Sequence, residues 1–257
     1  MAGLTVVWHH GTPQTGAVLP PLLEAARAHG LRLVSCARPS YEGSTPNPGR
    51  TVGAAARDVL DAMAALGVER FATVGASGGG PHALACAAQA PDRVTAVATL
   101  AGIAPYSDAF DWFGGMAAPG ALRAALGGRE ARALYAETAE FDPASFIAAD
   151  WRMLEGPWSS LGRDSMRAEQ QGHDGEIDDD VAFAGPWAVD LGSIRVPVLL
   201  VQGGSDRVVP RAHADRLAAM VPHAELWIRP RDGHVSVLGV LPVAMEWLRL
   251  AATSSPG

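Results

Sequence analysis

The stretch Phe71-Ala72-Thr73-Val74-Gly75-Ala76-Ser77-Gly78-Gly79 decides the fold of this chain. Its apolar first residues predict a buried strand, and the alanine-rich segment that follows, up to Ala90, predicts a helix. The sharp turn between them would hold Ser77 in a strained backbone conformation. A side chain two residues before or after the serine would collide with neighbouring backbone, and glycine at both places removes the clash. The stretch therefore indicates strand, turn and helix, with a serine exposed at the turn.

The same rhythm continues on both sides of this stretch. Short β-branched runs alternate with alanine-rich segments of helical length, which is typical of parallel βαβ units. The fold class is therefore α/β, with a mostly parallel sheet of about six strands flanked by helices. The predicted strands are Leu4–His9, Leu31–Cys36, Phe71–Gly75, Val94–Ala101, Val196–Gln202 and Glu225–Arg229, and the predicted helices are Val18–His29, Thr51–Leu66, Gly79–Ala90, Arg211–Met220 and Val237–Ala252.

Residues 105–191 break this rhythm. They lack β-branched runs, and segments such as Ala121–Thr138 and Ser145–Leu154 have helical composition between glycine pairs. We therefore expect residues 1–104 and 192–257 to form the two parts of one α/β core, with residues 105–191 inserted as a helical layer.

Composition narrows the class of function. The chain has 257 residues, of which 48% are hydrophobic and 18% charged, as in an ordinary globular protein. The net charge is −7 without a basic run, which argues against nucleic acid and favours a small neutral or cationic substrate. Cys36 and Cys86 are expected to be buried free thiols. Without a leader-like or membrane-spanning run, the expected location is cytoplasmic, with no membrane partner.

Two further residues complete a chemistry for Ser77. A serine hydroxyl is a poor nucleophile at neutral pH and needs a general base, which in turn needs an acid to fix its tautomer. Asp206 follows the strand Val196–Gln202, and His234 follows the next predicted strand. Because parallel strands deliver these loops to one edge of the sheet, we expect the three side chains to converge.

The segment His10-Gly11-Thr12-Pro13 follows the first predicted strand and should reach the same edge. A tetrahedral intermediate needs two backbone N–H donors for its oxyanion. Gly78, directly after the serine, would supply one. Thr12 would supply the other, because Pro13 has no N–H.

With these segments in this order, the chain resembles the serine α/β-hydrolase superfamily over nearly its whole length. Arg38-Pro39-Ser40-Tyr41-Glu42-Gly43-Ser44 is also similar to a loop of that superfamily, with Ser40 in place of its usual glycine. The chain looks most like the bacterial proline iminopeptidase-like and esterase-like members, in which a helical cap covers the site. The resemblance implies a Ser-His-Asp triad of Ser77, His234 and Asp206, with no cofactor and no metal.

One departure from the superfamily lies at the first strand. Members usually begin with an antiparallel hairpin before it, and here that strand begins at Leu4. Either the hairpin is missing and Leu31–Cys36 forms an edge, or the start was placed too late. An uncovered edge invites pairing, so we expect something to cover it, with a second subunit forming a homodimer as one candidate.

Several side chains could line a substrate site. The candidates are His82 and the aromatic residues Trp112, Trp151 and Trp158, although packing is the simpler role for each. Asp108, which follows the strand Val94–Ala101, is the alternative to Asp206 as the acid.

The acidic residues of the inserted layer also have alternative roles. Glu137, Glu140 and Asp150 are candidates for binding a substrate ammonium, as the resemblance to proline iminopeptidases implies. The run Asp178-Asp179-Asp180 instead indicates the capped first turn of a helix.

These observations predict a serine hydrolase that cleaves a small carboxylic ester or amide through an acyl-enzyme. Two other classes keep the same pocket. One is a lyase or cyclase that uses the triad for proton transfer, and the other is a non-catalytic protein that binds a small ligand.

Overall fold

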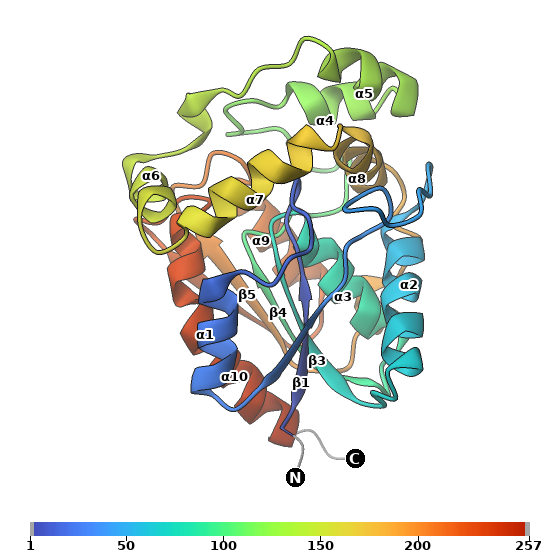
Figure 1. Ribbon diagram of the computed structural model, residues 1–257, viewed down its shortest axis with the longest axis vertical. Coiled ribbons are helices and arrows are strands. Elements are labelled where there is room, and N and C mark those ends of the chain that lie inside the picture. Colours follow the sequence, from blue (N-terminus) through green and yellow to red (C-terminus); the bar gives the residue numbers. More distant parts are fainter. Residues whose placement is uncertain (1–2, 255–257) are drawn as a thin grey trace.

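The structure is a computed structural model that describes residues 3–254. Six strands form one sheet in the order β2-β1-β3-β4-β5-β6, and every neighbouring pair is parallel (Figure 1). The α/β fold with six parallel strands is thus confirmed. The strands are β1 (Thr5–His9), β2 (Arg32–Ser35), β3 (Phe71–Ala76), β4 (Val94–Leu100), β5 (Val198–Gly203) and β6 (Ala224–Arg229).

Helices cover both faces of the sheet, because successive strand residues point to opposite sides. In β1, Val6 and Trp8 pack in a cluster with α1 (Pro20–Ala28) and α10 (Leu241–Ser254). Val7 points the other way, into a second cluster. The helices of that second cluster are α2 (Val52–Ala65), α3 (Gly79–Gln89) and α9 (Arg211–Met220).

The helix ends follow the chemistry of the sequence. The side chain of Thr51 accepts a hydrogen bond from the Ala54 amide and so caps α2. Gly30 and Gly67 follow α1 and α2 with φ of 65° and 67°, a conformation that favours glycine at a helix end. The last predicted helix is divided, because its start is a 3₁₀ turn, η3 (Ser236–Val240), which precedes α10.

Between β4 and β5 the chain forms a layer of short helices above the carboxyl ends of the strands (Figure 1). The segment Ala121–Thr138, which has helical composition, forms two helices, and Gly128 lies between them with a φ of 87°. The elements of this cap are α4 (Gly120–Ala125), α5 (Arg129–Ala136), η1 (Pro143–Ser145), α6 (Ala148–Glu155), α7 (Ser159–Gln170), α8 (Asp174–Ala184) and η2 (Leu191–Ser193).

The acidic run Asp178-Asp179-Asp180 lies elsewhere than expected. It sits in the middle of α8, which begins four residues earlier at Asp174, and all three carboxylates are buried. The prediction of a capped first turn was wrong, because the three carboxylates pair instead with arginines of other elements: Arg129 with Asp178, Arg50 with Asp179 and Arg132 with Asp180.

Two features bear on partners. Strand β2 lies at one edge of the sheet, as expected, and its coverage by a second subunit stays a prediction. Within residues 3–254, one segment, Ser236–Thr253, is long and apolar enough to cross a membrane by length and composition alone. Its side chains Leu241, Ala244, Met245 and Leu248 are buried in the core, as expected for a core helix of this kind.

Candidate active site

Ser77 occupies a tight turn between β3 and α3. Its φ is 53°, a left-handed conformation that is costly for serine and places the side chain at the apex of the turn. A Cβ at Gly75 would lie 2.3 Å from the carbonyl oxygen of Gly79, and a Cβ at Gly79 would lie 2.0 Å from that of His9. The steric reason for both glycines is therefore confirmed.

A continuous hydrogen-bond relay leads away from Ser77. Its Oγ lies 2.9 Å from Nε2 of His234, and Nδ1 of the same imidazole lies 2.8 Å from Oδ2 of Asp206. The three residues follow β3, β6 and β5, so the parallel sheet delivers them to one edge. Asp108, the alternative acid, is exposed and accepts a hydrogen bond from Tyr106 instead.

Asp206 is buried, and backbone amides of its own loop donate hydrogen bonds that fix the position of its carboxylate. Its Oδ1 accepts hydrogen bonds from the backbone amides of Val208 and Val209, each at 2.9 Å. Its Oδ2, which faces His234, also accepts one from Nε2 of Gln202 at 3.1 Å. Burial by itself would lower the pKa of His234, but the Asp206 carboxylate outweighs burial, so the pKa of His234 is raised. The imidazole is thus well suited to take up a proton.

The two expected oxyanion donors lie side by side. A Cβ at Gly78 would be 2.4 Å from Oγ1 of Thr12, and a Cβ at Gly11 would be 3.6 Å from Cβ of Ser77. Gly78 also precedes the first turn of α3, where backbone N–H groups are unpaired. The geometry thus brings the loop of Gly11 and Thr12 against Ser77.

Asp150 contacts the loop that carries His234 rather than a substrate. Its side chain is fully buried, and Oδ1 accepts hydrogen bonds from the amides of Val235 and Ser236 at 2.9 and 2.7 Å, and from the Ser236 hydroxyl at 2.8 Å. The prediction that Asp150 binds a substrate ammonium was therefore wrong, because its buried carboxylate already accepts hydrogen bonds from these protein donors. Glu137 and Glu140 are exposed and line neither cavity described next.

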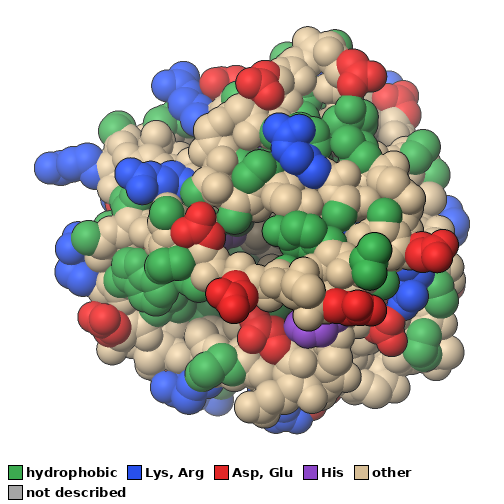
Figure 2. All heavy atoms as spheres, turned by 90° about the horizontal axis from the view of Figure 1, so that it is seen from above, with side chains coloured by type: hydrophobic (Ala, Val, Ile, Leu, Met, Phe, Trp, Pro, Cys, Tyr) green, Lys and Arg blue, Asp and Glu red, His purple; other side chains and the backbone are tan. Residues whose placement is uncertain are grey.

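Two cavities meet at Ser77. Both are lined by Ser77, His234 and Thr12, and Figure 2, which looks down on the cap, shows a hollow in this face among hydrophobic and acidic side chains. The smaller cavity, of about 150 Å³, is walled mainly by Phe146, Leu154, Leu161, Val235 and Leu238. The larger, of about 370 Å³, is walled by apolar groups including Ile103, Met116, Leu122 and Phe183, and by the charged residues Glu169, Glu176, Asp180 and Arg207.

The four expected lining residues are outside both cavities, which corrects the sequence prediction. His82 and Trp112 are buried, and Nε1 of Trp112 donates to the carbonyl oxygen of Ala104 at 2.8 Å. Trp158 is buried in the core, and Trp151 packs against Phe146 with ring centroids 5.4 Å apart. Each of the three tryptophan rings thus packs the protein, and the aromatic side chains that do line the cavities, beside aliphatic ones, are Phe141, Phe146 and Phe183.

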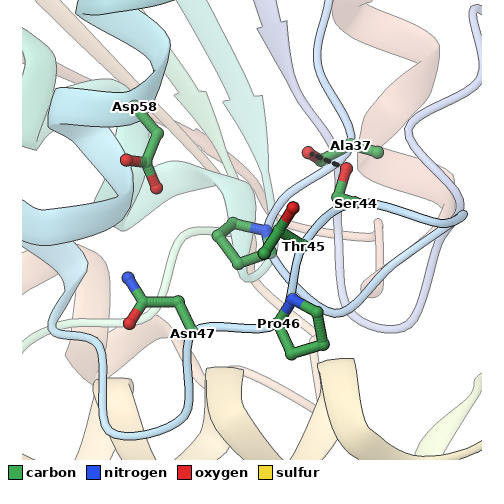
Figure 3. Close-up of a pocket in the computed structure, with 7 residues that line it drawn as sticks. Ala37, Ser44, Thr45, Pro46, Asn47 and Asp58 are labelled. Atoms are coloured by element: carbon green, nitrogen blue, oxygen red, sulfur yellow. Dashed lines mark hydrogen bonds between the residues drawn. The ribbon is translucent and has the colours of Figure 1, made fainter.

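A third hollow, of about 410 Å³, lies beside the loop of residues 37–47 and α2. Figure 3 shows Ser44, Asn47 and Asp58 around it, with the Ser44 hydroxyl bonded to the carbonyl oxygen of Ala37. None of its described lining residues belongs to the relay of Ser77, His234 and Asp206. Nor do residues 3–254 contain three metal-ligating side chains grouped to hold an ion.

Comparison with known proteins agrees with this geometry. The α/β-hydrolase fold family matches residues 5–239, and the chain belongs to that family. The chain is 31% identical over 196 residues to RutD of Caulobacter sp. (strain K31), which is named as a proposed carbamate hydrolase, with 72% of this chain and 66% of RutD covered.

Two other similar proteins extend the comparison. A 2-hydroxy-6-oxo-6-phenylhexa-2,4-dienoate hydrolase of Burkholderia cepacia is 29% identical over 199 residues, covering 70% of this chain and 61% of its own length. The match therefore spans just under two thirds of each of these two relatives. The enol-lactonase of Burkholderia xenovorans LB400 has the same fold, with a TM-score of 0.69, 20% identity, and 98% and 92% of the two chains covered.

Proposed function

We propose that this member of the α/β-hydrolase fold family is a serine hydrolase that cleaves a small carboxylic ester or amide through an acyl-enzyme. The observation that supports it most strongly is the unbroken relay from Asp206 through His234 to Ser77. Each link is within hydrogen-bonding distance, as proton transfer from Ser77 to His234 requires.

In the first half of the reaction, Ser77 Oγ attacks the substrate carbonyl carbon while Nε2 of His234 takes its proton. Asp206 steadies the imidazolium that forms. The carbonyl oxygen becomes an oxyanion and accepts hydrogen bonds from the backbone N–H groups of Gly78 and Thr12. His234 then gives its proton to the leaving alcohol or amine, and the acyl group stays on Ser77.

In the second half, a water molecule takes the place of the leaving group. His234 removes a proton from this water, which attacks the acyl carbon, and the same two N–H groups bind the second oxyanion. Collapse releases the carboxylic acid and returns the proton to Ser77. The protein groups used in these steps are the relay of Ser77, His234 and Asp206 and the N–H groups of Gly78 and Thr12. Ser77, His234 and Thr12 lie where the two cavities meet.

The two cavities suggest how a substrate divides about its scissile bond. The smaller, apolar cavity has room for a short acyl or alkyl group, and the larger takes the other half of the substrate. Glu169, Glu176 and Asp180 line the larger cavity together with Arg207, and Glu176 and Asp180 are both ion-paired with the buried Arg132. Because these pairs leave the cavity lining without a strong excess of either charge, a neutral group is favoured there.

A fluorophosphonate probe, which reacts covalently with activated serines, tests the proposal. We expect the wild-type protein to label at Ser77 and Ser77→Ala not to label. Ser165→Ala is the matched control, because Ser165 also lines both cavities but bonds to the carbonyl oxygen of Pro13 and not to His234. Equal labelling of wild type and Ser77→Ala would contradict the proposal.

A panel of substrates then separates the other two classes. p-Nitrophenyl esters of increasing acyl length, a thioester and an aminoacyl amide should identify hydrolysis, with short neutral esters turned over fastest. Labelling of Ser77 without turnover of any member would instead favour a lyase or a ligand-binding protein.

A further inference from the structure

Asp179 of α8 is a fully buried carboxylate directly behind the oxyanion loop, residues 10–12. Its Oδ2 accepts hydrogen bonds from Oγ1 of Thr12 at 2.6 Å, Nη2 of Arg38 at 2.6 Å and the Tyr41 hydroxyl at 2.9 Å. Its Oδ1 accepts one from Nη2 of Arg50 at 2.6 Å. Burial alone would raise the pKa of Asp179, but the two arginines outweigh burial and hold this pKa well below its usual range. Asp179 is therefore charged.

Arg38 extends from Asp179 to every residue of the oxyanion loop. Its guanidinium donates to the carbonyl oxygen of His10, to that of Gly11 at 3.0 Å and to Oγ1 of Thr12 at 3.0 Å. Its backbone amide donates to Nε2 of His10 at 3.1 Å. The orientation of Arg38 is set in turn by Asp179, which accepts from its Nε through both carboxylate oxygens at 3.1 Å. Helix α8 thus contacts the oxyanion loop both directly, at the Thr12 hydroxyl, and through Arg38.

The charges of this cluster are balanced. Arg50 also lies 3.4 Å from Asp178, so two buried arginines face two buried carboxylates. Taking such charges out of water costs about as much as their attraction returns, and a buried ion pair is weak evidence of a role in stability. The cluster instead fixes the orientation of Arg38. Its planar guanidinium is bonded to Asp179 on one side and to the oxyanion loop on the other, which leaves it little conformational freedom.

We propose that Asp179 is a positioning residue for the oxyanion hole. Through Arg38 and the Thr12 hydroxyl it holds the loop of residues 10–12 so that the Thr12 N–H faces Ser77 beside the N–H of Gly78. The inference rests on the proposed function, because an oxyanion hole matters only if Ser77 attacks a carbonyl. It makes the cap a part of the catalytic apparatus in addition to a cover for the substrate.

If Asp179 positions the loop, its removal should change the rate of acylation in one direction, and if it acts only through its charge, in the opposite direction. A carboxylate near a developing oxyanion repels it, so removal of the Asp179 charge alone would speed acylation. Loss of positioning would slow acylation, because the N–H donor would no longer point at the oxygen that becomes charged. The direction of the rate change therefore separates the two roles.

Thr12→Val and Thr12→Ser form the sharpest pair of variants. Valine keeps the shape and the backbone N–H of threonine but removes the hydroxyl that bonds to Asp179 and Arg38, and serine keeps that hydroxyl. Asp179→Asn weakens the whole cluster. Tyr41→Phe is the control, because it removes one hydrogen bond to Asp179 without touching the Thr12 side chain.

The experiment measures kcat and KM for p-nitrophenyl acetate, together with amide hydrogen exchange in the peptide that contains residues 10–12. We expect kcat to fall about 10²-fold in Asp179→Asn and about tenfold in Thr12→Val, since a small misplacement of catalytic groups has effects of this size. KM should change little and exchange should become faster in both variants. Thr12→Ser should lose less activity than Thr12→Val and show slower exchange than Thr12→Val, and Tyr41→Phe should stay close to wild type.

Other outcomes would overturn the inference. A faster Asp179→Asn, or a Thr12→Val that matches Thr12→Ser in both rate and exchange, would show that the cluster does not position the loop. If Asp179→Asn fails to fold, the Thr12 pair decides alone. If the wild type neither labels with fluorophosphonate nor hydrolyses esters, the proposed function fails, while the exchange of residues 10–12 still shows whether the cluster holds the loop.

Discussion

Two buried carboxylates flank Ser77, and they are held in different ways. Asp206 belongs to the core, and the amides of its own loop and Gln202 fix it. Asp179 belongs to the cap, and its partners Arg38 and Thr12 lie 141 and 167 residues away in the chain. The acid of the relay is thus held by local contacts, whereas the oxyanion loop depends on the docking of the cap. Substitution of Asp206 should affect the rate alone, and substitution of Asp179 should affect the rate and folding together.

The largest effect is expected at the nucleophile itself. Ser77→Ala should lower kcat by about 10⁶-fold, as for the loss of other triad serines, because no other group can form the acyl-enzyme. The melting temperature should change little, since alanine keeps the Cβ in the same turn and the substitution removes only Oγ. Ester hydrolysis and thermal unfolding measure the two quantities. Substantial remaining turnover would place the nucleophile elsewhere.

Asp206→Asn tests the local half of the comparison. An amide can donate a hydrogen bond to Nδ1 of His234 and so favours the wrong tautomer, which should lower kcat by about 10⁴-fold. The amides of Val208 and Val209 can still bond to the remaining side-chain oxygen. Gln202 loses its hydrogen bond to Oδ2 but keeps the one to the carbonyl oxygen of Val209 at 2.7 Å, so stability should change little. Steady-state kinetics and chemical denaturation check both parts. A variant that unfolds readily would contradict the contrast between the two carboxylates.

The site was predictable from the sequence in unequal parts. Ser77, Asp206, His234 and the loop of Thr12 could be placed because parallel strands deliver their loops to one edge, whatever the cap does. Asp179 and Asp150 were misinterpreted, because their buried partners come from segments far away in the sequence. The aliphatic cavity walls carried no signal, since a leucine in a substrate cavity and a leucine in the core look alike.

Asp150→Asn tests a contact between the cap and the loop of His234. The Asp150 carboxylate accepts three hydrogen bonds from the loop of His234 through Oδ1, and one from the Ile147 amide through Oδ2. In asparagine one of these oxygens becomes an NH₂ donor, which faces an N–H whichever way the amide is turned. We expect the free energy of unfolding to fall by about 1–3 kcal/mol, measured by chemical denaturation. Glu155→Gln, at the exposed end of the same helix, serves as the matched control and should leave stability unchanged.

The same variant should alter the pH profile. In the wild type, kcat/KM should rise with pH as His234 loses its proton, with a midpoint above the ordinary 6.5 because the pKa of His234 is raised. Asp150 is one of the charges that raise this pKa, so the midpoint should move to lower pH in Asp150→Asn. A midpoint that stays in place would show that Asp150 acts on the loop without acting on the proton.

The smallest effect is expected in the wall of the smaller cavity. A Cβ at Gly162 of α7 would have its nearest neighbour, Cδ2 of Leu154, at 3.8 Å, so alanine fits there. Gly162→Ala should raise the free energy of unfolding by about 0.5–1 kcal/mol through helix propensity. It should also narrow the cavity and shift the preference among p-nitrophenyl esters toward shorter acyl chains by a few-fold. An unchanged chain-length profile would mean that the acyl group lies in the larger cavity.

The most direct test of the central claim is mass spectrometry of the protein quenched during turnover of p-nitrophenyl acetate. The relay from Asp206 to Ser77 predicts one acetyl group per chain, located on the peptide that contains Ser77 and absent from Ser77→Ala. Acetylation of a different residue would contradict it. So would a burst of p-nitrophenol release from the wild type with no acetylated peptide in the quenched sample.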